Sequence, residues 1–246
     1  MRYSEREYKD FNSCSFRKTK EIFGGLSNMA SGFPLMVNGL KILTSEALYQ
    51  ACRYPHLPEV QEVIIAQKSP MTAKMKSKSY YAKSRSDWDN VRIKVMRWCL
   101  RVKLAQNFQK FGLLLESTGT NPIVEDSKRD SFWGAKKFHD GTFRGVNALG
   151  RLLMELRQEY CSMNRYKLLY VTPLKIDNFN LLGEPIQIID ERFNFIELFV
   201  KNWNANEAGF LELFSQLSGF IAQHNTGAQL DKYTRPPMSE NLSLFH

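Results

Sequence analysis

The sequence predicts an α+β fold, in which a compact, mainly helical domain carries a small sheet and a C-terminal α/β accessory extension packs on it. We expect the domain over residues 1–160 and the extension over residues 161–246. The 246 residues and the hydrophobic fraction of 43% suit one large domain with an appended piece. Apolar residues recur with helical spacing through most of the first 160 residues, and the pattern then changes to short strands.

An early hairpin and a short helix are the first predicted elements. Residues 33–43 alternate around Asn38-Gly39, and this dipeptide between apolar runs is a strong hairpin signal. Thr44-Ser45 are natural N-caps for the helix that follows, which should end before Pro55.

Longer helices are expected further along the domain. Asp87 is the predicted N-cap of a long helix whose apolar residues recur at three- and four-residue intervals. Its other face is charged, with Arg92, Lys94, Arg97, Arg101 and Lys103. The remaining predictions are helices over residues 59–67, 108–117 and 146–160, a strand over residues 122–125 and a basic segment over residues 68–86.

The extension has its own pattern. Apolar runs over residues 166–171, 186–190 and 195–200 predict short strands. Residues 208–221 favour an amphipathic helix, and the polar tail from Gln229 is expected to be loose.

Composition narrows the class of protein. No run of eighteen apolar residues exists, and the N-terminal residues are polar, so we expect neither a membrane span nor a secretory signal. The four cysteines and four histidines are scattered without the spacing of metal ligands. These features indicate a soluble cytoplasmic monomer with reduced cysteines and without metal or cofactor.

Charge is concentrated in the first part of the chain. The formal net charge is +9, with +11 over residues 1–160 and −2 over residues 161–246. A basic domain favours a phosphate-rich partner such as DNA, RNA or a nucleotide. The alternative is a soluble basic protein with no such partner.

Two groups of residues are candidates for chemistry. Glu46 shares a helix face with Gln50 and Arg53 and suits a general base or a stabiliser of positive charge; the alternative is a first-turn helix acid. Trp133, followed by Gly134 in a loop, offers a ring for stacking on a base, although most tryptophans lie in cores.

The helix beginning near residue 146 is a third candidate. Gly145 and Asn147 lie at its N-terminus, where free N–H groups bind anions. Gly150 lies inside the helix at a cost of about 1 kcal/mol relative to alanine, which fits close approach of a ligand or of another backbone. Plain helix packing is the alternative.

Six motifs in order resemble those of the NADAR family, also called YbiA-like. They lie at residues 23–29, 44–51, 69–75, 87–88, 130–134 and 147–157, and the resemblance covers about residues 16–160. It implies a compact α+β fold with N-glycosidase activity on ribosylated compounds. YbiA-like bacterial members cleave intermediates of riboflavin synthesis. Other members remove ADP-ribose from guanine in DNA and act as antitoxins to DarT-type ADP-ribosyltransferases.

Three departures from the short YbiA type resemble the DNA-directed branch. They are the basic leader at residues 16–20, Ala47-Leu48-Tyr49 where His-Tyr-Phe is common, and the C-terminal extension. The resemblance therefore implies ADP-ribosylated DNA or a nucleotide as substrate and a DarT-type toxin as functional counterpart. Two alternatives remain: an N-glycosidase of riboflavin intermediates, and a non-catalytic module that binds ADP-ribose or DNA.

The resemblance also suggests roles for residues. Glu46 would orient water and offset positive charge on the ribose, and Asp130 would hold the ribose hydroxyls. Lys20 and Lys74 are unranked candidates for phosphate contacts or for protonation of the leaving group. Further substrate contacts are expected from Trp133 or Trp88 by stacking, from Asn147, Gly150 and Arg151 at the pyrophosphate, and from Asn28, Gln50 and Gly134. With one strongly placed acid, a two-carboxylate scheme is not expected.

Overall fold

The computed structural model describes residues 4–201. The chain divides into two compact units, residues 1–193 and residues 194–246. The first unit thus continues beyond residue 160, where we expected the domain to end.

The first unit combines helices with several small sheets, which confirms the α+β class. The helices of the described residues are α1 (Ser45–Ala51), α2 (Pro58–Ile65), α3 (Pro70–Lys78), α4 (Trp88–Gln106), α5 (Phe108–Glu116), α6 (Ala148–Tyr160) and α7 (Arg192–Lys201). The strands are β1 (Arg6–Lys9), β2 (Cys14–Phe16), β3 (Leu35–Val37), β4 (Leu40–Ile42), β5 (Ile123–Glu125), β6 (Lys136–Lys137), β7 (Thr142–Gly145), β8 (Tyr170–Val171), β9 (Asn180–Leu181), β10 (Glu184–Pro185) and β11 (Ile189–Asp190). β1, β7 and β6 form an antiparallel sheet in that order, β2 pairs with β5 in parallel, and β3–β4, β9–β10 and β8–β11 are antiparallel pairs.

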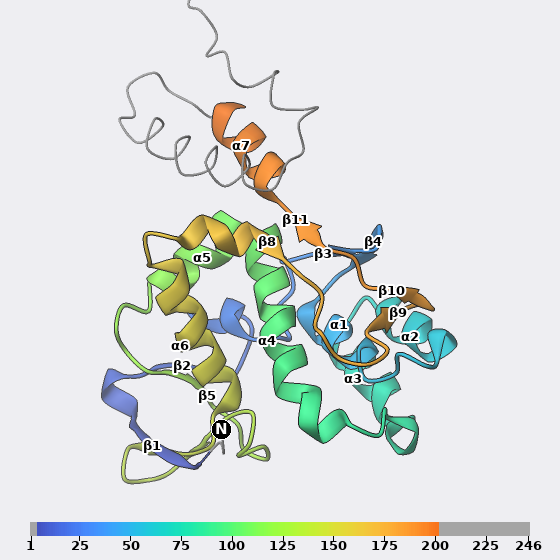
Figure 1. Ribbon diagram of the computed structural model, residues 1–246. Coiled ribbons are helices and arrows are strands. Elements are labelled where there is room, and N and C mark those ends of the chain that lie inside the picture. The colour runs from blue at the N-terminus through green and yellow to red at the C-terminus, as the bar shows by residue number, and fades with distance from the viewer. Residues whose placement is uncertain (1–3, 202–246) are drawn as a thin grey trace, which may run out of the picture. The chain divides into compact units, whose positions relative to one another are not determined.

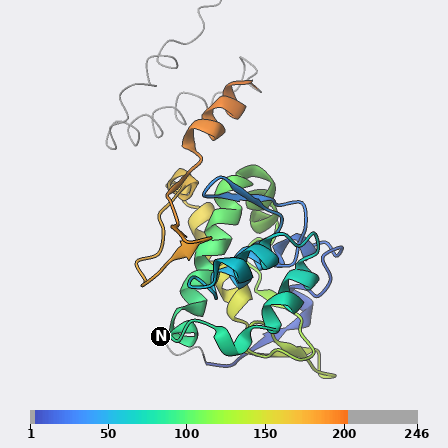
Figure 2. The same cartoon turned by 90° about the vertical axis from the view of Figure 1, so that its right-hand side faces the viewer.

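Helix α4 runs through the middle of the first unit, with α5 and α6 on one side and α1–α3 on the other (Figure 1). Figure 2 views the unit from the side of α1–α3. The apolar residues of α4 are buried, as their spacing predicted, and Val95 and Trp98 are examples. Arg97 and Arg101 pair with Glu155 and Glu159 of α6 at 2.8 Å and 2.6 Å, and so align the two helices.

The predicted hairpin and the helix after it are confirmed. Asn38 and Gly39 have φ angles of 51° and 74°, and both fit a two-residue turn between β3 and β4. The Thr44 hydroxyl accepts a hydrogen bond from the Ala47 N–H at 3.3 Å and caps α1. This local sequence therefore fixes where α1 begins and which residues its first turn presents.

One local expectation was wrong, and the structure completes two others. The basic segment over residues 68–86, for which no element was predicted, contains helix α3, which starts with Ser69 as N-cap and Pro70 in the first turn. Asp87 is the N-cap residue of α4, as predicted, but its side chain makes no capping hydrogen bond and its carboxylate pairs with Arg85 at 2.5 Å. Residues 195–200 lie in α7 and not in a strand, since a continuous apolar run does not distinguish the two by periodicity. The expected helix over residues 208–221 and the tail from Gln229 lie outside the described residues.

Residues 161–193 return across the first unit and are bound to it by side-chain hydrogen bonds. Trp98 Nε1 donates to the Thr172 carbonyl at 3.0 Å. The buried Gln61 amide donates to the Asn180 carbonyl at 2.9 Å and accepts from the Leu182 N–H at 2.7 Å. Burying this amide with its partners satisfied makes residues 161–193 part of the same packed unit.

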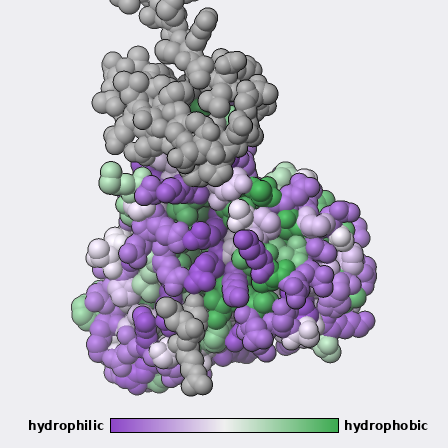
Figure 3. All heavy atoms as spheres, in the orientation of Figure 1, coloured by the Kyte–Doolittle hydropathy of each residue, from purple (hydrophilic) through white to green (hydrophobic). Residues whose placement is uncertain are grey.

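The visible surface is mostly hydrophilic, with hydrophobic atoms between the polar side chains (Figure 3). Within residues 4–201, no helix has the length and apolar character needed to cross a membrane.

Lys103 was expected on the charged face of α4, but it is fully buried. Its ammonium donates hydrogen bonds to the carbonyls of Gly25 and Ser27 at 2.7 Å and 3.1 Å. It also lies over the rings of Phe33 and Phe111, at 4.5 Å and 4.3 Å from their centroids. Burial lowers the pKa of Lys103 to about 7. This residue anchors the loop that leads to Asn28.

The depressed pKa of Lys103 predicts a pH dependence of stability. Between the folded value of about 7 and the unfolded value of about 10.4, the folded protein binds fewer protons than the unfolded chain. Its free energy of unfolding should therefore rise with pH across that window. Lys103→Met should remove this rise, which thermal melts from pH 6.5 to 10 measure.

Lys110→Met is the matched control, because Lys110 also donates to a loop carbonyl and lies over Phe33 but is exposed. That variant should keep the pH dependence of the wild type. The assignment would be contradicted if the melting temperatures of wild type and Lys103→Met changed with pH in the same way.

Candidate active site

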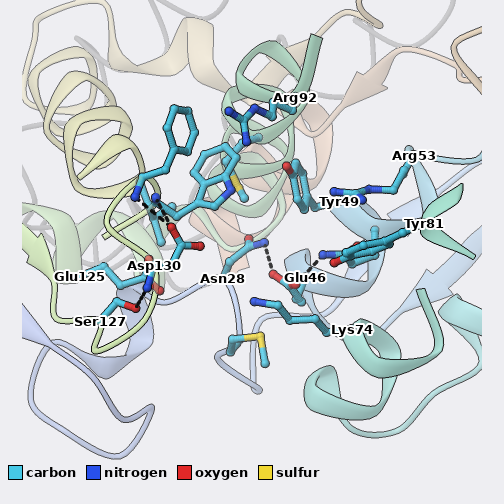
Figure 4. A pocket seen from close by; sticks show the side chains of 16 residues that line it. Asn28, Glu46, Tyr49, Arg53, Lys74, Tyr81, Arg92, Glu125, Ser127 and Asp130 are labelled. Carbon is cyan, nitrogen blue, oxygen red and sulfur yellow. Dashed lines mark hydrogen bonds between the residues drawn. The ribbon is translucent and has the colours of Figure 1, made fainter. Parts of the chain in front are cut away.

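A cavity of about 280 Å³ opens between α1, the start of α4 and the loop after β5 (Figure 4). Six predicted site residues line it, namely Asn28, Glu46, Gln50, Lys74, Asp130 and Trp133. They are joined there by Met29, Tyr49, Arg53, Tyr81, Arg92, Met96, Glu125, Ser127, Phe132 and Leu149. Motifs separated by about a hundred residues in the sequence thus share one cavity.

Glu46 is buried and held at both carboxylate oxygens. Asn28 Nδ2 donates to Oε2 at 3.0 Å, and Gln50 Nε2 donates to Oε1 at 2.8 Å. The backbone of the same pair is also joined, because the Glu46 N–H donates to the Asn28 carbonyl at 3.0 Å. The spacing of four residues between Glu46 and Gln50 produces one of these bonds, as the sequence indicated.

The hydrogen-bond chain continues from α1 into α3. Ser77 Oγ donates to Gln50 Oε1 at 2.6 Å, and the Tyr54 hydroxyl donates to the Ser77 carbonyl at 2.7 Å. This chain fixes α3 against α1. Lys74, three residues before Ser77 on α3, lines the cavity as a result.

Glu125 is a second acid in the cavity, and the sequence analysis missed it. It ends β5, and its N–H donates to Asn147 Oδ1 at 3.2 Å. Burial raises the pKa of Glu125 to about 7, and the negative charges of Glu46 and Asp130 add to this while Lys74 opposes it. The expectation of a single placed acid was wrong, because only the fold brings the end of β5 to the cavity.

Asp130 shapes the loop that closes the cavity. Its Oδ1 accepts hydrogen bonds from the N–H groups of Phe132 and Trp133, both at 2.9 Å. The Asp130 N–H in turn donates to Ser127 Oγ at 3.0 Å. Asp130 therefore positions the aromatic residues after it, and its carboxylate still borders the cavity.

Of the two tryptophans expected to stack on a ring, only Trp133 lines the cavity. Trp88 is buried behind Tyr49, with ring centroids 5.1 Å apart, and Trp133 packs on the same tyrosine at 5.6 Å. Tyr49 thus stands between the two tryptophans, and Trp88 supports the cavity wall from behind.

The N-terminus of α6 reaches the cavity only through Leu149, and its backbone donors are already used. The N–H groups of Ala148 and Leu149 donate to the carbonyls of Phe132 and Trp133 at 2.9 Å and 3.0 Å, and so the loop backbone caps the helix. Asn147 has a φ angle of 50°, and its side chain donates to the Ile123 carbonyl at 2.8 Å. The expected pyrophosphate contact is not favoured, because these donors already have partners.

Two glycines have packing roles near this helix terminus. A Cβ at Gly150 would overlap the Ile123 carbonyl oxygen, and one at Gly134 would overlap the Glu125 carbonyl oxygen. The close approach expected at Gly150 is therefore that of β5 and not of a ligand.

Two expected phosphate-binding residues also lie elsewhere. Arg151 borders a separate groove with Arg6 and Arg157, and Lys20 borders another with Arg17 and Lys18. Neither side chain lines the cavity. Within residues 4–201, no cluster of three His, Cys, Asp or Glu side chains is arranged to hold a metal ion.

The packing role of Gly150 is testable without substrate. Gly150→Ala should lower the melting temperature even though alanine favours helix, because the new methyl group pushes α6 from β5. We expect a loss on the order of 1–3 kcal/mol of unfolding free energy by chemical denaturation. Gln158→Ala on the exposed face of α6 is the control and should be near neutral. Unchanged stability of Gly150→Ala would favour the ligand-approach interpretation instead.

Comparison with known proteins places this geometry in a family. Residues 15–160 match the model of the NADAR domain. The chain is 34% identical over 145 residues to "N-glycosidase YbiA" of Escherichia coli, and the match covers 59% of this chain and 86% of that protein. It is 34% identical over 146 residues to a riboflavin biosynthesis protein of Vibrio vulnificus, covering 58% of this chain and 37% of that protein.

A solved structure agrees with these matches. The NMR structure of Escherichia coli YbiA aligns with a TM-score of 0.52 at 32% identity, and covers 61% of this chain and 85% of that one. The family match spans more than half of the chain and contains every residue that lines the cavity. On these grounds, the chain belongs to the NADAR family.

Proposed function

We propose that this protein is an N-glycosidase that removes ADP-ribose from modified guanine in DNA, and that it acts as antitoxin to a DarT-type DNA ADP-ribosyltransferase. The observation that carries the chemistry is a pair of carboxyl groups in one cavity. Glu46 is fixed at both oxygens, and the pKa of Glu125 is raised to about 7.

Hydrolysis of an N-glycosidic bond needs a proton for the leaving nitrogen and a water for C1 of the ribose. The electron pair of the C1–N bond goes to nitrogen, and positive charge develops on the ribose. The water oxygen then bonds to C1, and the water loses a proton. Two carboxyl groups with different environments suit these two roles.

Glu46 is proposed as the group that orients the water, accepts its proton and offsets the charge on the ribose. Its amide partners Asn28 and Gln50 hold the carboxylate in one orientation, so little reorganisation is needed during the reaction. Its place beside the cavity, and not on an exposed first turn, favours this role over that of a plain helix acid.

Glu125 is proposed as the proton donor to the leaving nitrogen. With a pKa of about 7, a substantial fraction carries a proton at neutral pH, which suits a general acid. In Figure 4, Glu125 and Asp130 lie on the opposite side of the cavity from Glu46 and Lys74. Asp130 is kept as a partner for ribose hydroxyls, and Lys74 as a contact for negative charge near the leaving base.

A DNA substrate is supported by the charge of the chain. Residues 1–160 carry +11, and the exposed Lys76, Lys78 and Lys83 lie close in sequence to the cavity residues Lys74 and Tyr81. A basic segment of this kind suits a phosphate backbone. The antitoxin role is supported by the resemblance of residues 16–20 and 47–49 to the DNA-directed branch.

A second candidate function has its own support. Relatives from Vibrio vulnificus and Zea mays, the latter 33% identical over 161 residues and matching 60% of this chain and 25% of its own length, are described as riboflavin biosynthesis proteins. An N-glycosidase of ribosylated pyrimidine intermediates would use the same two carboxyl groups.

One experiment distinguishes the candidates. Purified protein is incubated in parallel with ADP-ribosylated guanine DNA and with ribosylated pyrimidine intermediates, and released sugar is quantified. Release from the DNA supports the proposal, and release from the pyrimidines alone overturns it. Co-expression with a DarT-type toxin tests the antitoxin role, because the wild type should restore growth and Glu46→Gln should not.

Glu46→Gln should lower kcat on the order of 10²–10³-fold, the range typical for loss of one positioned catalytic group. Folding should persist, because Asn28 Oδ1 has no partner and can accept from the new amide after the Asn28 side chain turns over. Substrate binding should change less than turnover. Steady-state kinetics and a thermal melt on this variant check both statements.

Glu59→Gln, at an exposed first-turn acid of α2, is the matched control and should keep normal turnover. Near-normal turnover of Glu46→Gln would transfer the catalytic role to Asp130 or Lys74. The non-catalytic module would instead be favoured if the wild type releases no sugar and Glu46→Gln binds the ligand as tightly as the wild type does.

The raised pKa of Glu125 predicts the pH profile of kcat/KM. As the pH rises through about 7, Glu125 loses its proton and the protonation of the leaving nitrogen fails, so activity should fall above pH 7. Glu125→Gln should lower activity and abolish this descending limb. A descending limb near pH 7 that survives in Glu125→Gln would assign the acid to another group.

Binding to modified DNA should weaken steeply with salt. Each phosphate neutralised adds about 0.7–0.9 to the slope of log K against log salt concentration. Replacing Lys76 and Lys78 together by Gln should reduce the slope by about one to two units if both contact phosphates. Fluorescence anisotropy on labelled DNA at several salt concentrations measures it, and a flat wild-type slope would argue for a small-molecule substrate.

A further inference from the structure

We propose that Arg53 and Arg92, with the Tyr49 hydroxyl between them, form the subsite for the phosphate groups attached to the ribose of the substrate. This inference rests on the proposed function in one respect, namely that the substrate is a phosphorylated riboside. It assigns the phosphate contacts to α4, to Tyr49 of α1 and to the turn after α1, and not to the N–H groups at the start of α6.

Arg53 is held by aromatic rings and not by a carboxylate among the described contacts. Its guanidinium carbon lies 4.1 Å from the centroid of Tyr81 and 4.6 Å from that of Trp88. Its Nε is buried and has no hydrogen-bond partner. The two rings fix the plane of the guanidinium without using its N–H donors, and this buried donor is costly unless a ligand accepts from it.

Arg92 repeats this arrangement on α4. Its guanidinium carbon lies 3.9 Å from the centroid of Phe132, and its Nε is also buried without a hydrogen-bond partner. The Asp89 carboxylate, one turn earlier on the helix, is 3.6 Å from this Nε, beyond hydrogen-bonding distance, and is largely exposed to solvent. A surface pair of this kind leaves the guanidinium available to a stronger acceptor.

Tyr49 stands between the two arginines in Figure 4. Burial raises the pKa of Tyr49 well above its usual value and Glu46 adds to this, while the positive charges of Arg53 and Arg92 act in the opposite direction. The hydroxyl therefore stays protonated and lies in the field of both guanidinium groups. A neutral hydroxyl donor between two guanidinium groups is suited to bind an oxyanion.

The carboxyl groups of the cavity lie on two of its sides, and two arginines lie near Tyr49. Glu125 and Asp130 face Glu46 across the cavity, with Lys74 beside Glu46, while Arg53 and Arg92 supply cations near Tyr49. A phosphorylated riboside fits this polarity in one orientation, with its glycosidic carbon toward the carboxyl groups and its phosphate groups toward the arginines. Planar guanidinium groups suit phosphate because they donate two parallel hydrogen bonds.

The test measures ligand binding in the Glu46→Gln background, so that it does not depend on turnover. Calorimetric titrations use ADP-ribose, ribose 5-phosphate and inorganic pyrophosphate. The variants are Arg53→Met and Arg92→Met. Arg53→Lys and Arg92→Lys are milder changes, which keep the positive charge but lose the paired N–H donors of the guanidinium. Melting temperatures establish that each variant is folded. Lys94→Met, two residues after Arg92 on the exposed face of α4, is the charge-matched control.

We expect each Arg→Met change to weaken binding of ADP-ribose on the order of 10–100-fold, and Arg→Lys to weaken it less. Lys94→Met should bind as the parent does. If the affinity falls for ADP-ribose and pyrophosphate but not for ribose 5-phosphate, the subsite binds a diphosphate. If the affinity for ribose 5-phosphate falls equally, the subsite binds a single phosphate. Both results support the subsite.

Two outcomes overturn the proposal: folded variants of both arginines that bind all three ligands as tightly as the parent, or a parent that binds none of them. Failure of the proposed function gives a different result. Protein that does not release sugar from ADP-ribosylated DNA, but still binds a phosphorylated ligand through Arg53 and Arg92, retains the subsite and loses only the assigned substrate.

Discussion

The buried carboxylate of Glu46 is the constraint on which the site depends. A carboxylate taken out of water needs a hydrogen bond at each oxygen, because an unpaired buried charge is strongly unfavourable. Asn28 and Gln50 meet this need and thereby join a loop to α1, and Ser77 extends the same network to α3. The need to satisfy one charge therefore specifies how three segments of the chain meet.

Two sets of contacts outside the cavity hold this polar network in place. Lys103 holds the loop before Asn28 through the carbonyls of Gly25 and Ser27, from a position inside the core. On the other side of the cavity, Asn147 holds β5 against the start of α6, and the absence of a side chain at Gly150 lets the two approach. Glu125 reaches the cavity because of this close contact, and its surroundings raise its pKa.

Aromatic rings also fix the orientation of two cationic side chains at the cavity. Arg53 and Arg92 are stacked on rings and keep buried donors without partners, whereas Arg97 and Arg101 on α4 are neutralised by glutamates of α6. One helix thus carries arginines that join it to its neighbour and one that borders the cavity. The neighbours of each side chain, and not its residue type, separate these roles.

The sequence by itself determined the local elements and the set of site motifs. Asn38-Gly39 specified the hairpin, Thr44 the start of α1, and the four-residue spacing of Glu46 and Gln50 their shared face, because each depends on neighbours within one or two turns. Only the tertiary structure decided that Lys103 is buried, that Glu125 enters the cavity and that Trp88, Asn147 and Gly150 support its walls. Burial, a shifted pKa and the partner of a donor all arise from contacts between residues far apart in the chain, and periodicity records no such contacts.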